Sequence, residues 1–205
     1  MSILTNWGYA LPDADAIPEM MTATEYRTLS GRSDPDDRVN AEIAAADAAI
    51  RNFVGWHLTP AMACRFETIA SDRRIVFTGN DMLIQLPARL VSAVSSVMIQ
   101  GTAHDDYFID PAGLLRVFGV CYPGRAAPVT VEYTAGLSGD MVAPIKELIA
   151  HRVTHALAVP AGITSEASGG VSVTYNANWI NNSRATALAG DNKELLVPYR
   201  VMGVF

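Results

Sequence analysis

The feature that most constrains the fold is a change of apolar period along the chain. After Asp34-Pro35, apolar side chains recur at spacings of 4, 3, 4 and 3 residues. This spacing predicts one apolar stripe along a helix of about six turns, which has Pro35 at its first position and ends at Gly55. The members of the stripe are Val39, Ile43, Ala46, Ile50 and Phe53.

A second long helix is predicted to begin at Pro144 and to end before Pro160-Ala-Gly162. Its apolar face consists of Ile145, Leu148, Ile149, Ala156 and Leu157. A shorter helix is expected between Thr22 and Gly31, because Thr22 and Glu25 have the spacing of a capping box. We expect the two long apolar faces to pack against each other, or jointly against a sheet.

Between the long helices the period changes to short runs rich in Val, Ile and Phe, which Gly, Pro, Asn or Asp separate. Such spacing is typical of a meander of five or six antiparallel strands. The runs cover 73–77, 82–86, 90–99, 107–109, 114–118 and 129–133. The sequence therefore predicts an α+β fold with N-terminal helices, a central antiparallel β region, a second long helix and an extended C-terminal arm.

We expect residues 1–205 to form a single structural domain. Its parts are an extended arm (1–21), a helical part (22–56), a β-rich part (57–143), a helix (144–159) and a C-terminal arm (160–205). In the last part, alternating apolar residues predict a strand whose apolar face is a subunit interface formed by Val171, Val173 and Tyr175. The apolar end, Leu195–Phe205, is expected to pack either on its own domain or on a partner.

The charge is sparse and unevenly distributed. Charged residues make up 18% of the chain, against about 25% in typical domains, and the net charge is −6. Residues 1–56 carry nine acids and four bases (−5), whereas residues 57–205 carry twelve acids and eleven bases (−1). This balance argues against a protein that binds nucleic acid by neutralising phosphates. No apolar run approaches the ~18 residues that span a membrane, and no basic residue precedes Arg27, so we expect synthesis in the cytoplasm.

Few residues suggest catalysis. His151 and His155 are four residues apart on the second predicted helix, so they share a face and could hold one metal ion. A zinc-protease motif needs Glu directly after the first His, and Arg152 stands there. Cys64 and Cys121 form no CxxC pair and are expected to be buried free thiols. We expect no enzymatic activity and no cofactor; a metal-dependent enzyme built on the two histidines is the alternative that this pair leaves open.

Four short stretches follow one another between about residues 34 and 200. They are the Asp36-Asp37 start of a helix that runs to Phe53-Val-Gly-Trp56, Leu86-Pro87 with Val91-Ser-Ala-Val94-Ser-Ser-Val97, Val129-Thr-Val-Glu-Tyr-Thr-Ala-Gly136, and Leu195-Leu-Val-Pro-Tyr-Arg200. In this order they resemble the head–tail connector proteins of tailed bacteriophages, also called adaptor or head-completion proteins. One position departs from the family pattern: a proline expected before Val91 is Leu90 here, which should leave the start of that strand less constrained.

The resemblance implies a structural protein of the virion neck, assembled in the host cytoplasm. Proteins of this family form a ring, commonly of twelve copies, beneath the portal; the ring extends the DNA channel and docks the next neck or tail protein. DNA would pass through without specific binding, and no membrane is involved. Because the C-terminal segment often reaches the portal in this family, the resemblance assigns portal binding to Leu195, Leu196, Pro198, Tyr199, Arg200 and Phe205. Another neck or tail component, a stopper or a tail-terminator, is the alternative, but those proteins consist mostly of strands.

Overall fold

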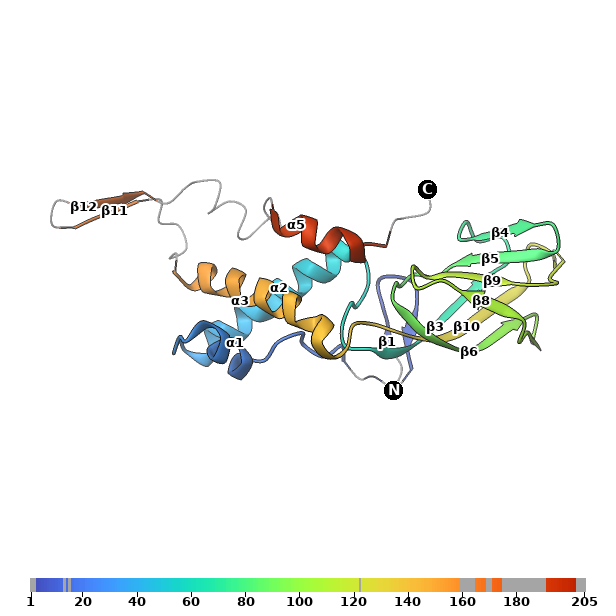
Figure 1. The fold of residues 1–205 in the computed structure, drawn as a ribbon, viewed down its shortest axis with the longest axis horizontal. Helices are drawn as coiled ribbons and strands as arrows, with labels where there is room; N and C mark the ends of the chain where they lie inside the picture. The colour runs from blue at the N-terminus through green and yellow to red at the C-terminus, as the bar shows by residue number, and fades with distance from the viewer. Residues whose placement is uncertain are drawn as a thin grey trace. The chain divides into compact units, whose positions relative to one another are not determined.

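The structure, a computed structural model, describes residues 3–12, 14, 16–121, 123–158, 165–168, 171–174 and 191–201. Its helices and antiparallel sheets confirm the predicted α+β class (Figure 1). Within the described residues, the chain divides into two compact units. Unit 1 draws on Met1–Pro18, Gly55–Ser138 and Tyr199–Phe205, and unit 2 draws on Glu19–Val54 and Gly139–Pro198. Both units combine segments that are distant in the sequence; the single structural domain stays a prediction.

Unit 1 contains two antiparallel sheets (Figure 1). The order of the six-stranded sheet is β1 (Ile3–Leu4), β2 (Ala10–Leu11), β3 (Met62–Ile69), β10 (Pro128–Ala135), β6 (Val91–Ile99) and β7 (Thr102–Ala103). The order of the four-stranded sheet is β4 (Ile75–Thr78), β5 (Asp81–Gln85), β9 (Leu114–Val117) and β8 (Tyr107–Ile109). The six predicted runs all become strands, with ends that shift by one or two residues, whereas β3 and the two-residue strands were not predicted.

Each sheet of unit 1 buries one of its faces, because alternate residues of a strand point to opposite sides. In the six-stranded sheet the buried side chains include Cys64, Phe66, Val129, Val131 and Tyr133. In the four-stranded sheet they are Ile75, Met82, Ile84, Leu115 and Val117. The two sheets differ in the side chains that they direct outward.

The N-terminal segment, expected as an extended arm, is extended but forms part of unit 1. Its strand β2 pairs with β3, and the side chain of Tyr9 is buried. The Tyr9 hydroxyl lies 2.7 Å from Nδ1 of His57 and accepts a hydrogen bond of 3.0 Å from the backbone N–H of His57. Nε2 of His57 donates to the carbonyl oxygen of Ala135 at 2.9 Å, so Nδ1 is the acceptor for Tyr9. These bonds satisfy both ring nitrogens of a fully buried histidine and fix the segment to the sheet.

Unit 2 is built on two long helices that pack against each other. It contains α1 (Ala23–Ser30), α2 (Asp36–Val54), the 3-10 turn η1 (Gly139–Val142), α3 (Ala143–Ala158), the hairpin β11 (Ser165–Ser168) and β12 (Val171–Thr174), and α5 (Asp191–Leu196). A second 3-10 turn, η2 (Val197–Tyr199), follows α5. The C-terminal arm was expected to be extended, but its described residues 191–199 are helical. Helices α2 and α3 are in contact, which confirms the first of the two packing arrangements expected (Figure 1). The capping box of α1 is also present, with Thr22 and Glu25 bonded reciprocally.

The buried faces of these helices match the predicted stripes except at Phe53 on α2 and at Ala156 on α3, which is only half-buried. Side chains buried on α2 are Val39, Ile43, Ala46, Ile50 and Val54, and those on α3 are Ile145, Leu148, Ile149, Ala150, Val153 and Leu157. Phe53, expected in the stripe, is only half-buried, and Val54 takes the buried place because it lies four residues after Ile50.

Helix α2 also buries a carboxylate that the sequence analysis did not single out. Asp47 is 3% exposed, and its Oδ2 accepts a hydrogen bond of 2.7 Å from the backbone N–H of Met20. Arg51, one turn along the helix, lies 3.9 Å from the same oxygen. Burial raises the pKa of Asp47, although the Met20 N–H and the Arg51 charge act in the opposite direction.

Candidate functional site

Parts of the four stretches that carry the connector resemblance lie in unit 1, where they form two pairwise contacts. Strand β10 pairs with β6 along most of its length, which joins the second and third stretches. The buried indole of Trp56 donates a hydrogen bond of 2.7 Å from Nε1 to the carbonyl oxygen of Tyr199, which joins the first and last. Nη1 of Arg89 donates to the carbonyl oxygen of Arg200 at 3.2 Å. The stretches therefore act first of all as elements that hold the fold together.

Gly136, at the end of the third stretch, occupies a position that requires glycine. Its φ is +132°, in the region that side chains disfavour. A Cβ atom there would lie 2.5 Å from the carbonyl oxygen of Pro60 and 2.7 Å from the Cα of Ala61. The last residue of the third stretch is therefore fixed by close backbone approach.

Leu90 stands where the connector pattern has a proline, and we expected this change to leave the start of the strand less constrained. The backbone at Leu90 is nevertheless constrained, in a different way. Its φ is +55°, whereas the proline ring fixes φ near about −65°. Its backbone N–H donates a hydrogen bond of 2.7 Å to the carbonyl oxygen of Pro111, and proline has no N–H to donate. The chain at this position is held by a bond that the family residue could not make.

The C-terminal segment predicted to bind the portal is divided between buried and exposed side chains. Leu196 is fully buried within the chain. Leu195 and Val197 on either side of it are 53% and 52% exposed, and Pro198 and Arg200 are exposed as well. Tyr199 is half-buried and anchored through its carbonyl oxygen, as described above, and Phe205 lies outside the described residues. Portal binding by the exposed members stays a prediction.

The subunit interface predicted around residue 173 lies in the β11–β12 hairpin. Val171 pairs with Ser168, and Val173 pairs with Glu166. Tyr175 lies outside the described residues. The strand is where the alternation indicated; its role as an interface stays a prediction.

The outer face of the four-stranded sheet in unit 1 carries three of the exposed large apolar side chains, Val76, Phe108 and Leu114. Val76 pairs with Leu83, Leu83 with Arg116, and Arg116 with Phe108, so these residues form one row across all four strands. Val76 is 55% exposed and Phe108 is 60% exposed. Leu114, two residues along β9 on the same side, is 40% exposed. Sequence periodicity identified these strands but could not say which of their two faces would stay uncovered.

An ion pair crosses this face. Arg116 donates from Nε at 3.0 Å and from Nη2 at 2.5 Å to the same oxygen, Oδ2 of Asp81, and its guanidinium lies 4.9 Å from the ring centroid of Phe118. The hydrogen bonds from Arg116 lower the pKa of the Asp81 carboxyl. The outer face thus combines apolar side chains with one fixed, charge-paired group, as the contact surfaces of proteins commonly do.

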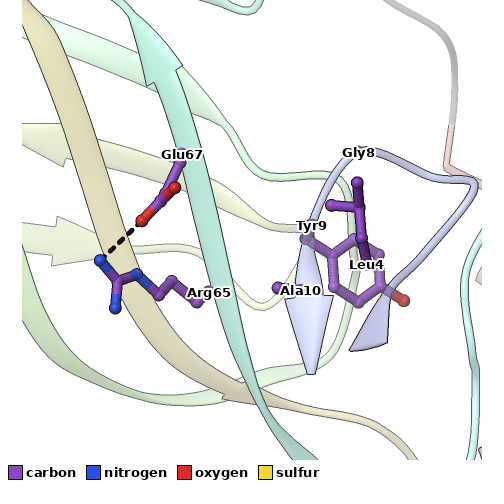
Figure 2. Close-up of a pocket in the computed structure, with 6 residues that line it drawn as sticks. All are labelled: Leu4, Gly8, Tyr9, Ala10, Arg65 and Glu67. Carbon is purple, nitrogen blue, oxygen red and sulfur yellow. Dashed lines mark ion pairs between the residues drawn. The ribbon is translucent and has the colours of Figure 1, made fainter. Parts of the chain in front are cut away.

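The outer face of the six-stranded sheet carries ion-paired side chains in addition to two exposed apolar ones, Leu4 and Ile69. Arg65 pairs with Glu67 at 2.6 Å and lies 3.8 Å from Glu132 on the neighbouring strand. Beside it is a shallow pocket of about 350 Å³ lined by Leu4, Gly8, Tyr9, Ala10, Arg65 and Glu67 (Figure 2). In Figure 2 the two charged side chains face each other across their ion pair. Since the hydroxyl of Tyr9 is bonded to His57, the pocket holds no uncommitted reactive group among these six residues.

The two histidines considered for a metal-dependent enzyme lie side by side, but no third candidate ligand joins them among the described residues. Nε2 of His151 and Nε2 of His155 lie 3.1 Å apart on α3, and burial, followed by the nearby His151, lowers the pKa of His155. Among the described residues, no group of three or more His, Cys, Asp or Glu side chains could hold a metal ion. Burial raises the pKa of the Cys64 thiol to about 12. Cys121, also expected to be buried, is exposed because it follows β9 outside any strand.

Comparison with known proteins adds no family assignment. No family model matches the chain, and no curated protein matches it. No helix in the described part of the chain is long and apolar enough to span a membrane.

Proposed function

We propose that this chain is a structural subunit of the head–tail connector of a tailed bacteriophage. In this role it forms a ring below the portal, extends the DNA channel and docks the next neck or tail protein. The observation that carries the proposal is the exposed apolar row on the outer face of the four-stranded sheet, together with the ordered sequence stretches that resemble connectors. Exposed apolar surface of this kind marks sites of protein–protein contact.

A ring needs two different contact surfaces on each subunit, since each copy touches one neighbour with one surface and the other neighbour with another. The outer face of the four-stranded sheet supplies one of them, through Val76, Phe108 and Leu114. The predicted interface on β12 is a candidate for the other. The low content of charged residues agrees with a subunit whose flanks are covered by copies of itself, because interface centres are depleted of charge.

The exposed side chains of the C-terminal segment are the proposed contact with the portal. Leu195 and Val197 lie in a segment that is held by the burial of Leu196 between them. A fixed apolar segment loses less conformational entropy on binding than a free one. The net charge of −6 suits a channel wall that DNA passes without adhering to it.

The experiment is a measurement of mass in solution by light scattering over a wide range of protein concentration, alone and with the portal protein of the same phage. We expect a closed ring of about twelve copies that co-elutes with portal. A Leu195→Ser/Val197→Ser variant should still form the ring and lose portal, whereas Leu29→Ser, at an equally exposed position on α1, should keep both. A chain that stays monomeric and ignores portal at every concentration contradicts the proposal. A ring that binds the tail tube and not the portal would favour a tail-terminator instead.

A further inference from the structure

The outer edge of α3 carries two histidines whose ring nitrogens converge. His151 and His155 are four residues apart and therefore lie one above the other on the same side of the helix. Their Nε2 atoms are 3.1 Å apart, and their ring centroids are 4.4 Å apart. His151 is exposed and His155 is half-buried. The helix thus brings two imidazole nitrogens to one point at its edge.

The surroundings of the pair suit a cation. Helix α3 is held in place by its buried face, so the two turns that carry the histidines are rigidly spaced. Glu147 is exposed one turn before His151 on the same side of the helix and adds a negative charge there. Arg152, the positive group between the histidines, interacts electrostatically with Glu42 of α2.

We propose that His151 and His155 chelate one divalent transition-metal ion through their Nε2 atoms. Imidazole nitrogens bind such ions at about 2.0–2.1 Å, so nitrogens that are 3.1 Å apart subtend an angle of about 95–102° at a shared ion. This angle lies between the roughly 90° of square-planar or octahedral coordination and the roughly 109° of tetrahedral coordination. The distance between the two nitrogens therefore fits one shared ion, which would replace the proton of the hydrogen bond between the two rings.

The protein supplies two ligands and leaves the other positions to water. Within the described ranges no third His, Cys, Asp or Glu completes the set. Imidazole suits Cu²⁺, Ni²⁺ and Zn²⁺, and the general affinity order places Cu²⁺ above both of the others. An ion held by two successive turns of α3 binds the folded chain more tightly than the unfolded one, so it also stabilises the fold. This metal site is independent of the connector role.

The test is a calorimetric titration of the full chain with CuCl₂, NiCl₂ or ZnCl₂ alone. We expect one ion per chain in the tightest step, with Cu²⁺ bound most tightly. His151→Ala and His155→Ala should each weaken binding at least tenfold, because each removes one of two ligands. The paramagnetic resonance spectrum of bound Cu²⁺ should show two nitrogen donors in the wild type and one in either variant. Alanine is the best helix former, so circular dichroism should show α3 intact in both.

Two control variants separate this site from other metal ligands. His104→Ala removes a histidine that has no second histidine one helical turn away, and Cys121→Ser removes the exposed thiol. Both should bind Cu²⁺ as the wild type does. The proposal is overturned if the wild type binds no ion, if the two α3 variants bind as the wild type does, or if Cys121→Ser abolishes binding.

Discussion

The apolar stripe of α2 and the outer row of the four-stranded sheet differ in exposure: the stripe is buried, and the row is exposed. The stripe from Val39 to Val54 is buried, because α3 supplies a matching apolar face within the same unit. Val76 and Phe108 have no such cover and remain more than half exposed. Apolar surface costs free energy when it faces water, so the exposed row is the surface on which the proposed contact between subunits can be tested.

The six-stranded sheet also exposes two apolar side chains, Leu4 and Ile69, but it places them beside charged residues. Both sheets of unit 1 alternate buried and outward residues, but the six-stranded sheet directs Arg65, Glu67 and Glu132 outward, where they form ion pairs. An antiparallel sheet with one solvated face normally has such polar outward residues. The four-stranded sheet departs from that pattern, and the predictions below test whether the departure reflects a contact surface.

The largest effect on the free energy of unfolding is expected for substitutions in the covered apolar surface between α2 and α3. Ile43→Asp on α2 or Ile149→Asp on α3 places an unpaired charge in the α2–α3 interface, and each should cost several kcal/mol and unfold the unit. Chemical denaturation followed by circular dichroism measures the loss. The matched variant Phe108→Asp on the exposed row should stay folded. Retained folding of both helix variants would mean that these faces are not the core.

A smaller effect is expected for the buried polar group of unit 1. Tyr9→Phe keeps the ring but leaves the backbone N–H and Nδ1 of His57 without their shared partner, which should cost about 1–3 kcal/mol in the free energy of unfolding. Tyr107→Phe is the control. The Tyr107 hydroxyl is half-buried and donates one hydrogen bond, of 3.0 Å, to the carbonyl oxygen of Val94. Equal losses in the two variants would argue against a special role for the His57 contacts.

A pH-dependent effect is expected at Asp47, the charged group inside the otherwise apolar interior of unit 2. Because its pKa is raised in the folded state, folding favours the protonated form. The stability that this carboxyl contributes is complete below its unfolded pKa and declines as the pH rises through the folded value. Asp47→Asn removes this dependence, so the unfolding free energy of the variant relative to the wild type should increase with rising pH.

Asp34→Asn is the control of opposite sign. The hydrogen bond from Arg32 lowers the pKa of Asp34, so the wild type gains stability above the unfolded pKa of this carboxyl. Relative to the wild type, this variant should lose stability as the pH rises. Denaturant unfolding at a series of pH values measures both trends, and parallel trends in the two variants would contradict the burial effect at Asp47.

Sequence periodicity predicted the two long helices, and the runs rich in Val, Ile and Phe between turn residues predicted most strands, whereas helix α5 was not predicted. These patterns missed β3, since Arg65 and Glu67 alternate with only two fully buried side chains, Cys64 and Phe66. Local patterns also could not reveal that Tyr9 meets His57 or that Trp56 meets Tyr199, because those contacts join distant segments. For the same reason the sequence predicted the strands that carry the exposed row but could not predict that the outer face of these strands would be exposed.

The smallest effect on stability, and the most informative one, is expected at the exposed row itself. Val76→Thr/Phe108→Thr keeps residues with good strand propensity at outward positions, so the free energy of unfolding should change by no more than about 0.5 kcal/mol per site. Light scattering should nevertheless show loss of the assembled ring, because the apolar contact with the neighbour is removed. Ile69→Thr, at a singly exposed position on β3 of the other sheet, should leave assembly unchanged. If the Val76/Phe108 variant assembles as the wild type does, this face is not the contact surface, and the difference between the two sheets has another cause.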